Sequence, residues 1–257
     1  MSASHLLFEI DGPVARITFN RPEAHNAMTW AMYEALGAAC DAIASDPAVQ
    51  CAVLRGAGGK AFVAGTDINQ FLNFADAEDG LRYEAEMERI LRRLEALPVP
   101  SVAVVDGWVV GGGLALASLC DIRIATPDAR FGLPIARTLG NCLSVRNIAR
   151  LSALLGPSRI KRLVMLAEML TVPELVQSGY LAAVVERDQL DAKQDEVVAS
   201  LCAHAPLTMR ATKQALARLN DNMPTDADLV ALCYGSADFR QGVRAYVEKR
   251  TPQWRGE

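Results

Sequence analysis

Alternating apolar and polar residues near the start of the chain predict a β-hairpin. Leu6–Ile10 and Val14–Asn20 alternate on either side of Asp11-Gly12-Pro13, a turn sequence that suits two antiparallel strands. Apolar residues then recur at helical spacing over Thr29–Ile43, and Ser45-Asp46-Pro47 ends that segment. We therefore expect a hairpin followed by an amphipathic helix.

Strands and helices then alternate as far as about residue 185. Further strands are predicted at Cys51–Arg55, Ser101–Val105, Ile122–Ala125, near Phe131 and at Ala183–Val185. Further helices are predicted at Leu81–Leu97, Gly112–Leu119, Val145–Leu155, Ser158–Ala167 and Pro173–Ser178, the last with Gly179 as its C-cap. This alternation predicts an α/β domain over residues 1–190.

The pattern after about Leu190 is almost entirely helical. The expected helices are Asp191–Ala203, Pro206–Leu219, Thr225–Tyr234 and Ser236–Lys249. Residues 191–257 have several apolar helix faces and no sheet of their own, so we expect them to dock on a neighbour in an oligomer.

Composition narrows the classes of protein to consider. The 257 residues are 51% hydrophobic and 22% charged, which is ordinary for a globular protein with a large core. A net charge of −4 argues against a nucleic-acid partner. Met1–Phe8 lacks the basic start of a signal peptide, and the apolar stretch Trp108–Cys120 is too short to span a membrane. We expect no membrane association.

The chain contains 6 cysteines, and their spacing bears on metal binding and on the cellular compartment. No two of them form a C-x-x-C pair, and their spacing matches no metal site, so we expect no bound metal. Most lie in apolar segments and are predicted to be small buried thiols. A reduced, cytoplasmic location is expected.

The segment Trp108–Ala117 contains Gly111-Gly112-Gly113 at the predicted start of a helix. Glycine allows a ligand to approach the backbone closely, and the first N–H groups of a helix are unpaired and carry partial positive charge. Such a site can stabilise an oxygen that becomes negative during a reaction. The alternative is that the glycines only permit tight packing of the helix against a strand.

Two better-known glycine motifs do not fit this chain. A dinucleotide fingerprint requires a third glycine where Leu116 stands, and a P-loop requires Ser or Thr where Ala61 follows Gly59-Lys60. The run therefore favours chemistry at a carbonyl group.

Several further segments share an order and spacing that is far more specific than any one of them. They are Asn20-Arg21-Pro22, Asn26-Ala27-Met28, Lys60-Ala61-Phe62-Val63-Ala64-Gly65-Thr66-Asp67-Ile68, Pro100-Ser101-Val102-Ala103-Val104-Val105-Asp106-Gly107, Cys120-Asp121-Ile122-Arg123-Ile124-Ala125, Phe131-Gly132-Leu133-Pro134 and Val247-Glu248-Lys249-Arg250. With the glycine run, these segments resemble the crotonase family, also called the enoyl-CoA hydratase/isomerase family.

The resemblance implies a spiral of ββα turns followed by helices that build trimers, often paired into hexamers. It also implies an acyl-CoA thioester as substrate, with coenzyme A present only as part of that substrate and no separate cofactor. By resemblance, an enolate-like oxyanion accepts the backbone N–H groups of Thr66 and Gly112. Removal of one such donor costs a few kcal/mol of transition-state stabilisation.

The family's nucleotide-binding segments correspond here to Ala24, His25 and Ala64–Ile68, which includes Asp67 and Ile68. Lys249 resembles the basic residue that some members offer to the CoA phosphates. Each position also has a structural explanation. His25 can be a loop residue, Asp67 a cap of the following helix, and Lys249 a solvated charge.

The chain departs from the hydratase pattern at two positions. Hydratases of this family use two glutamates, the first of which lies two residues after the three glycines, where this chain has Ala115. The second follows Phe-Gly-x-Pro, where this chain has Ile135, or Ala136 if one residue is inserted. None of these side chains can carry a proton, so standard hydration and the isomerisation that uses the second glutamate are both in doubt.

Other residues are candidates for a role beside the acyl group. Glu84, Glu86 and Glu88 lie in the segment that borders the acyl pocket in the family, although a solvated helix face is the expectation for them. Cys142 is a possible nucleophile but is expected to be a small buried thiol. Arg137 is a possible partner for a substrate carboxylate, but a surface ion pair is expected.

Three hypotheses follow from the sequence. The chain is an enoyl-CoA hydratase/isomerase-like enzyme with a non-standard proton carrier, a CoA-thioester binder without catalysis, or a crotonase that performs another reaction, such as thioester hydrolysis or decarboxylation. The first is the preferred hypothesis because the oxyanion and CoA-binding segments are retained.

Overall fold

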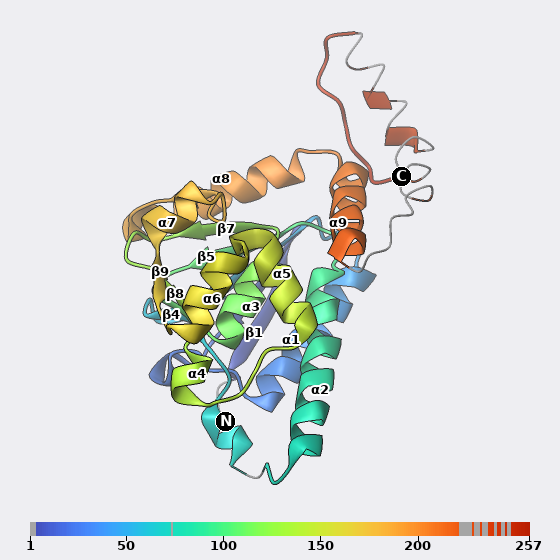
Figure 1. Cartoon of the computed structure of the whole chain (residues 1–257). Helices are drawn as coiled ribbons and strands as arrows, with labels where there is room; N and C mark the ends of the chain where they lie inside the picture. The colour runs from blue at the N-terminus through green and yellow to red at the C-terminus, as the bar shows by residue number, and fades with distance from the viewer. Residues whose placement is uncertain are drawn as a thin grey trace.

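The computed structural model of the chain describes residues 4–72, 74–220, 236–238, 241–242 and 248–257, together with residues 228, 232 and 245. The predicted helices Thr225–Tyr234 and Ser236–Lys249 therefore lie largely outside the described residues. Two β-sheets are surrounded by helices (Figure 1). Within the described ranges, no helix combines the length and apolar character needed to cross a membrane.

The larger sheet has the strand order β1-β2-β3-β5-β7-β10. Its strands are β1 (Leu6–Asp11), β2 (Val14–Phe19), β3 (Cys51–Gly56), β5 (Ser101–Val105), β7 (Ile122–Ala125) and β10 (Ala183–Val184). β1 and β2 are antiparallel and form the predicted hairpin, in which Asp11 pairs with Val14 around Gly12 at φ 56°. The later strands pair in parallel, and the central strand β5 is buried throughout, as expected for a parallel sheet covered on both faces.

The smaller sheet has the order β4-β6-β8-β9. Its strands are β4 (Ala61–Ala64), β6 (Trp108–Val110), β8 (Arg130–Gly132) and β9 (Met169–Thr171). The hydrophobic pattern had not indicated β4, β6 or β9, because segments this short show too little alternation to be distinguished from loops. β6 lies between β5 and the glycine run.

Helices connect the strands in a repeated order and cover the sheets. They are α1 (Trp30–Ser45), α2 (Ala77–Glu95), α3 (Gly112–Leu119), α4 (Ile135–Thr138), α5 (Val145–Leu155), α6 (Pro157–Met165), α7 (Val172–Gln177), α8 (Leu190–Cys202) and α9 (Pro206–Asn220), with short 3₁₀ helices η1 (Pro22–Ala24), η2 (Ile68–Phe71) and η3 (Arg187–Gln189). The units β3-β4-α2, β5-β6-α3 and β7-β8-α4 each give one strand to the larger sheet, one to the smaller sheet and then a helix. The chain is therefore a spiral of ββα turns.

The long helices begin where their side chains can bond to backbone N–H groups. Thr29 accepts the N–H of Met32 at the start of α1. At the start of α2, Asp76 and Asp79 form a capping box, in which each carboxylate accepts the backbone N–H of the other residue. These caps fix the starts of α1 and α2, which are two of the helices that supply side chains to the cavity described below.

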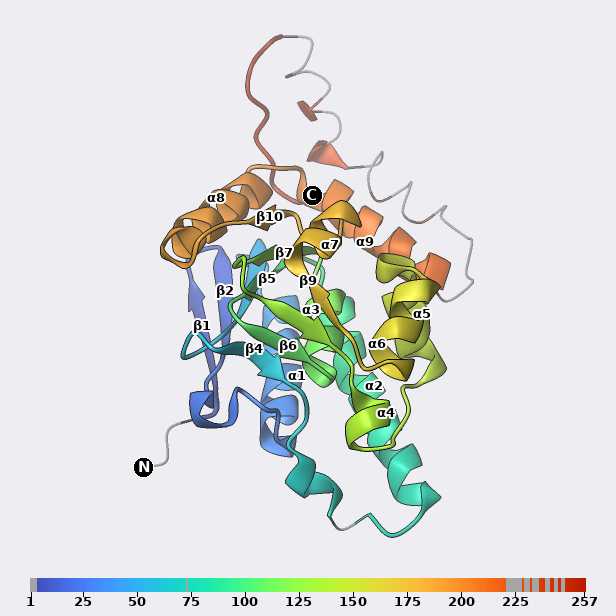
Figure 2. The same cartoon turned by 60° about the vertical axis from the view of Figure 1, so that its left-hand side comes forward.

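A large apolar core fills the space between the sheets and the helices α1, α2 and α3 and includes Leu36, Ile90 and Leu116. A second cluster joins the other face of the larger sheet to α8 through Leu190 and Val198. Figure 2 shows α8 beside β10 and β7, and in both views the last residues of the chain return toward α9, where Gly256 lies beside Pro206.

Candidate active site

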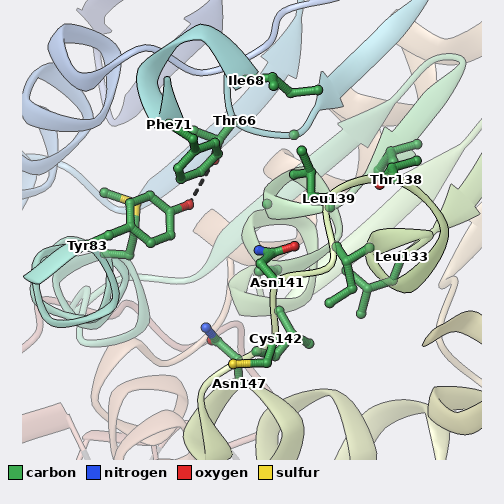
Figure 3. Close-up of a pocket in the computed structure, with 18 of the residues that line it drawn as sticks. Thr66, Ile68, Phe71, Tyr83, Leu133, Thr138, Leu139, Asn141, Cys142 and Asn147 are labelled. Atoms are coloured by element: carbon green, nitrogen blue, oxygen red, sulfur yellow. Dashed lines mark hydrogen bonds between the residues drawn. The ribbon is translucent and has the colours of Figure 1, made fainter. Parts of the chain in front are cut away.

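A cavity of about 220 Å³ lies where α2, the start of α3, α4 and η2 meet. Figure 3 shows Thr66 and Tyr83 together on one side, with Leu139, Asn141 and Leu133 across from them. Most of the lining is apolar, from Ile68, Phe71, Met87, Leu91, Leu133, Ile135, Leu139 and Leu143. An apolar cavity with a few polar groups is typical of a small-molecule site.

The glycine run forms one end of this cavity. Gly111 adopts φ 58° and ψ −123°, a backbone conformation that side chains rarely allow, and its N–H donates to Gly132 O. A Cβ on Gly113 would lie 1.9 Å from Val63 O, so this glycine permits close packing of α3 on β4. Gly112 instead lines the cavity. The run thus permits close packing of α3 on β4 and leaves Gly112 open to the cavity.

Thr66 lies beside Gly112 at the same end. Met28 N donates to Gly65 O and Asp67 N donates to Met28 O, which fixes the backbone on both sides of Thr66. A Cβ built on Gly112 would lie 4.0 Å from Thr66 N. Among the described residues, no backbone carbonyl accepts the N–H of Thr66 or that of Gly112. Two unpaired backbone donors therefore flank one point of the cavity.

Three hydroxyl groups lie against these donors. Tyr33 Oη is 2.8 Å from Thr66 Oγ1, and Tyr83 Oη is 3.1 Å from the same atom, a contact drawn in Figure 3. Tyr33 comes from α1 and Tyr83 from α2. Burial raises the pKa of both phenols, so both keep their protons. Two hydrogen bonds use two of the three hydroxyl protons, and the third proton has no acceptor within the cluster.

No motif in the sequence indicated that these two tyrosines line the cavity. They are 33 and 17 residues from Thr66 along the chain, respectively. Edge-to-face contacts hold Tyr83 against Trp30 and Phe71, with ring centroids 5.5 and 5.0 Å apart. Only the packing of α1 and α2 brings the hydroxyls together.

The positions where the resemblance led us to expect glutamates carry apolar side chains. Ala115 projects from α3 and Ile135 from α4, and both line the cavity. Ala136, the other residue considered for the second position, is exposed and does not line the cavity. The hydrocarbon groups at these positions cannot transfer protons.

The three candidate glutamates of α2 have different surroundings. Glu86 pairs with Arg89 at 2.5 Å on the outer face of the helix, which agrees with the expected solvated position. That expectation was wrong for Glu88, which bonds to Arg150, and for Glu84, which lines the cavity. Burial raises the pKa of Glu84, while the N–H of Ser144, donated to its carboxylate, partly opposes the shift.

The segments assigned to nucleotide binding lie together beside the cavity. Ala64 and Ile68 line the cavity, and Ala64 N donates to the carbonyl of His25, which is exposed and follows Ala24. Asp67 caps η2 by accepting the N–H of Asn69.

Asp67 also binds a neighbouring arginine. Its carboxylate lies 2.6 Å from Arg21 Nη1, a contact that lowers the pKa of Asp67. The predicted capping role of Asp67 is therefore confirmed, and the same carboxylate fixes the loop that begins at Arg21.

Lys249 is exposed and does not line this cavity. Arg137 is also exposed and outside the lining. Neither side chain is brought to the cavity within this chain.

The loop between α4 and α5 carries Asn141 and Cys142, which both line the cavity. The prediction that Cys142 is a buried thiol was wrong, because its side chain is exposed. The prediction holds for Cys40, Cys51 and Cys120, where burial raises each pKa to about 12. Among the described residues, no group of three or more potential ligands is placed to hold a metal ion.

Comparison with known proteins identifies the family. The enoyl-CoA hydratase/isomerase family model matches residues 9–257. A short-chain-enoyl-CoA hydratase of Clostridium acetobutylicum is 32% identical over 255 residues, which are 97% of each chain. A 2,3-dehydroadipyl-CoA hydratase of Escherichia coli K12 is 30% identical over 258 residues, covering 98% of this chain and 99% of that protein.

Solved structures agree with the sequence relatives. An enoyl-CoA hydratase/carnithine racemase from Magnetospirillum magneticum superimposes with a TM-score of 0.91 at 32% identity, covering 100% of this chain and 97% of that one. The ββα spiral is therefore the crotonase fold. With the family match over nearly the whole chain, this protein belongs to the enoyl-CoA hydratase/isomerase family.

Proposed function

We propose that this protein is an enzyme that binds an acyl-CoA thioester and stabilises an enolate of it. The backbone N–H groups of Thr66 and Gly112 donate to the thioester oxygen as it becomes negative. The observation that carries this proposal is that two unpaired backbone donors flank one end of an apolar cavity. The donors are fixed by β4 and α3, so they need no reorganisation when charge develops.

The hydroxyl cluster supports the same assignment. One of its three protons is left over, and a Cβ on Gly112 would lie 2.9 Å from Tyr33 Oη and 3.6 Å from Thr66 Oγ1. When Tyr33 or Thr66 holds the spare proton, that proton can be donated beside the two backbone N–H groups. It gives the oxyanion a third donor, supplied by a side chain.

The CoA moiety is assigned to the neighbouring surface. Ala24, His25, Ala64, Asp67 and Ile68 would contact the nucleotide. Lys249 would reach the CoA phosphates only if another copy of the chain brings it close, which agrees with the trimer or dimer of trimers expected for this family. The substrate carries the only coenzyme required.

The reaction assigned is of the enoyl-CoA hydratase/isomerase type, with the acyl group in the apolar cavity. A second function, a CoA-thioester binder without catalysis, is favoured by one observation. Ala115 and Ile135 place hydrocarbon on the walls where the family's two proton carriers stand. Thioester hydrolysis or decarboxylation remains the alternative if the enolate site acts with other groups.

An assay with enoyl-CoA thioesters tests the enzyme assignment. Purified protein is incubated with crotonyl-CoA and with longer enoyl-CoAs, and turnover is measured as the loss of the conjugated thioester absorbance. Gly112→Pro is the control, because proline is tolerated at the first residue of a helix but has no N–H. Turnover by the wild type that Gly112→Pro lacks supports the proposal. Calorimetry that detects acyl-CoA binding, together with mass spectrometry that detects no turnover of any thioester, would instead support a CoA-thioester binder without catalysis.

A further inference from the structure

Glu84 is the one carboxylate among the described residues that line the cavity. It lies on α2 with Met87 and Leu91, three and seven positions further on, so the three share one helix face. The lining also contains three other titratable groups, which are Tyr33, Tyr83 and Cys142. Both phenols hold their protons because burial raises their pKa values.

Nearby carboxylates are already occupied by arginines. Glu88 lies 2.7 Å from Arg150 and 3.1 Å from Arg146, and Arg150 also bonds to Glu95. The guanidinium of Arg150 is only 5% exposed, so this network fixes α5 against α2. Glu88 and Glu95 are thus engaged in the ion pairs that join α2 to α5.

Glu84 has a different environment. Its carboxylate accepts the N–H of Ser144, which lies directly before α5, and it is surrounded by the apolar walls of the cavity. Partial burial raises the pKa of Glu84 above its ordinary value of 4.5. A carboxyl group with a raised pKa exchanges protons more readily near neutral pH.

We propose that Glu84, supplied by α2, is the acid–base residue of this enzyme and acts in place of the carboxylates missing at Ala115 and Ile135. This inference rests on the proposed enolate function. The carboxylate takes a proton from Cα of the bound thioester, and the electron pair of that C–H bond forms the enolate. The enolate oxygen accepts the N–H groups of Thr66 and Gly112. Glu84 then returns the proton to a carbon of the acyl chain, and the carbonyl reforms.

The test measures this proton transfer without requiring knowledge of the natural acyl group. Butyryl-CoA is incubated with the enzyme in D₂O, and deuterium at Cα is measured by mass spectrometry. Glu84→Gln keeps an oxygen that can accept the N–H of Ser144 but cannot carry a proton. We expect exchange to fall by about 10²–10⁴-fold while calorimetric affinity for butyryl-CoA is unchanged. Glu86→Gln, on the outer face of the same helix, is the matched control and should exchange as the wild type does.

The pH profile separates catalysis from a purely structural role. Wild-type exchange should rise with pH as Glu84 loses its proton, with the midpoint above 4.5, and the residual exchange of Glu84→Gln should lack that rise. A Glu84→Gln protein with wild-type exchange overturns the role of Glu84, while the enolate function stands. A wild type that binds butyryl-CoA but exchanges no deuterium, or that does not bind it, overturns both.

Discussion

Replacing Gly112 with alanine should slow the reaction strongly while leaving the fold intact. The added Cβ would lie 4.0 Å from Thr66 N, at the point where a thioester oxygen must accept both backbone N–H groups. The oxygen and the methyl group compete for this space. If the oxygen loses one donor, the rate falls by about 10²–10³-fold, or about 2.7–4 kcal/mol of transition-state stabilisation.

The effect on stability should be small because two changes oppose each other. Alanine within a helix is favoured over glycine by roughly 0.5–1 kcal/mol. The new Cβ would also lie 2.9 Å from Tyr33 Oη, so the phenol must move and weaken its 2.8 Å hydrogen bond to Thr66. That bond contributes about 0.5–1.5 kcal/mol. The free energy of unfolding should therefore change by no more than about 1 kcal/mol.

The assay combines deuterium exchange into butyryl-CoA with thermal unfolding. Gly112→Ala should lose exchange and keep a melting temperature near that of the wild type. Adding Tyr33→Phe removes the crowded hydroxyl, so the double variant should regain stability but not exchange. Gly113→Ala is the contrasting variant, because its Cβ would lie 1.9 Å from Val63 O and should prevent folding. Full exchange by a folded Gly112→Ala protein would refute placement of the carbonyl beside Gly112.

Three further changes test other parts of the site. Thr66→Ala keeps the backbone N–H but removes the hydroxyl shared by the two tyrosines, so deuterium exchange should fall by about 10²-fold. Thr66→Ser keeps a hydroxyl and should exchange as the wild type does. Equal rates for the two variants would remove the third donor from the mechanism. Iodoacetamide should modify exposed Cys142 before buried Cys40, Cys51 and Cys120, whose raised pKa values keep them as thiols. Saturating butyryl-CoA should slow the labelling of Cys142, as measured by peptide mapping. Undiminished labelling would place the acyl group elsewhere. Arg21 lowers the pKa of Asp67, so the stabilisation from this pair is present above the unfolded-state pKa, near 3.8, and is lost as pH falls through the lower folded-state value. In urea titrations, Asp67→Asn should therefore lower the free energy of unfolding at pH 7 but much less at low pH. An equal loss at both pH values would contradict the ion pair.

Much of the fold could be predicted from the hydrophobic pattern. The helix over Gly112–Leu119 and the strand over Ser101–Val105 were predicted with the bounds that the structure has. Both are long enough, or apolar enough, to carry a clear signal. The strands of the smaller sheet span three or four residues, and β6 directly precedes the glycine run. Such strands are stabilised by their neighbours rather than by their own pattern, so β4, β6 and β9 had to be seen in the structure. For β8, the pattern predicted only a strand near Phe131.

The sequence by itself determined the family, because the glycine run and the segment around Thr66 are local features with a fixed spacing. It also showed that Ala115 and Ile135 cannot transfer protons. Only the tertiary structure decided which other side chains reach the cavity. Tyr33, Tyr83 and Glu84 reach the cavity because α1 and α2 pack beside α3, whereas Glu86 and Glu88 of the same helix are turned toward arginines. Helical residues separated by one or two positions face different surroundings, and packing between helices decides which of them meets the substrate.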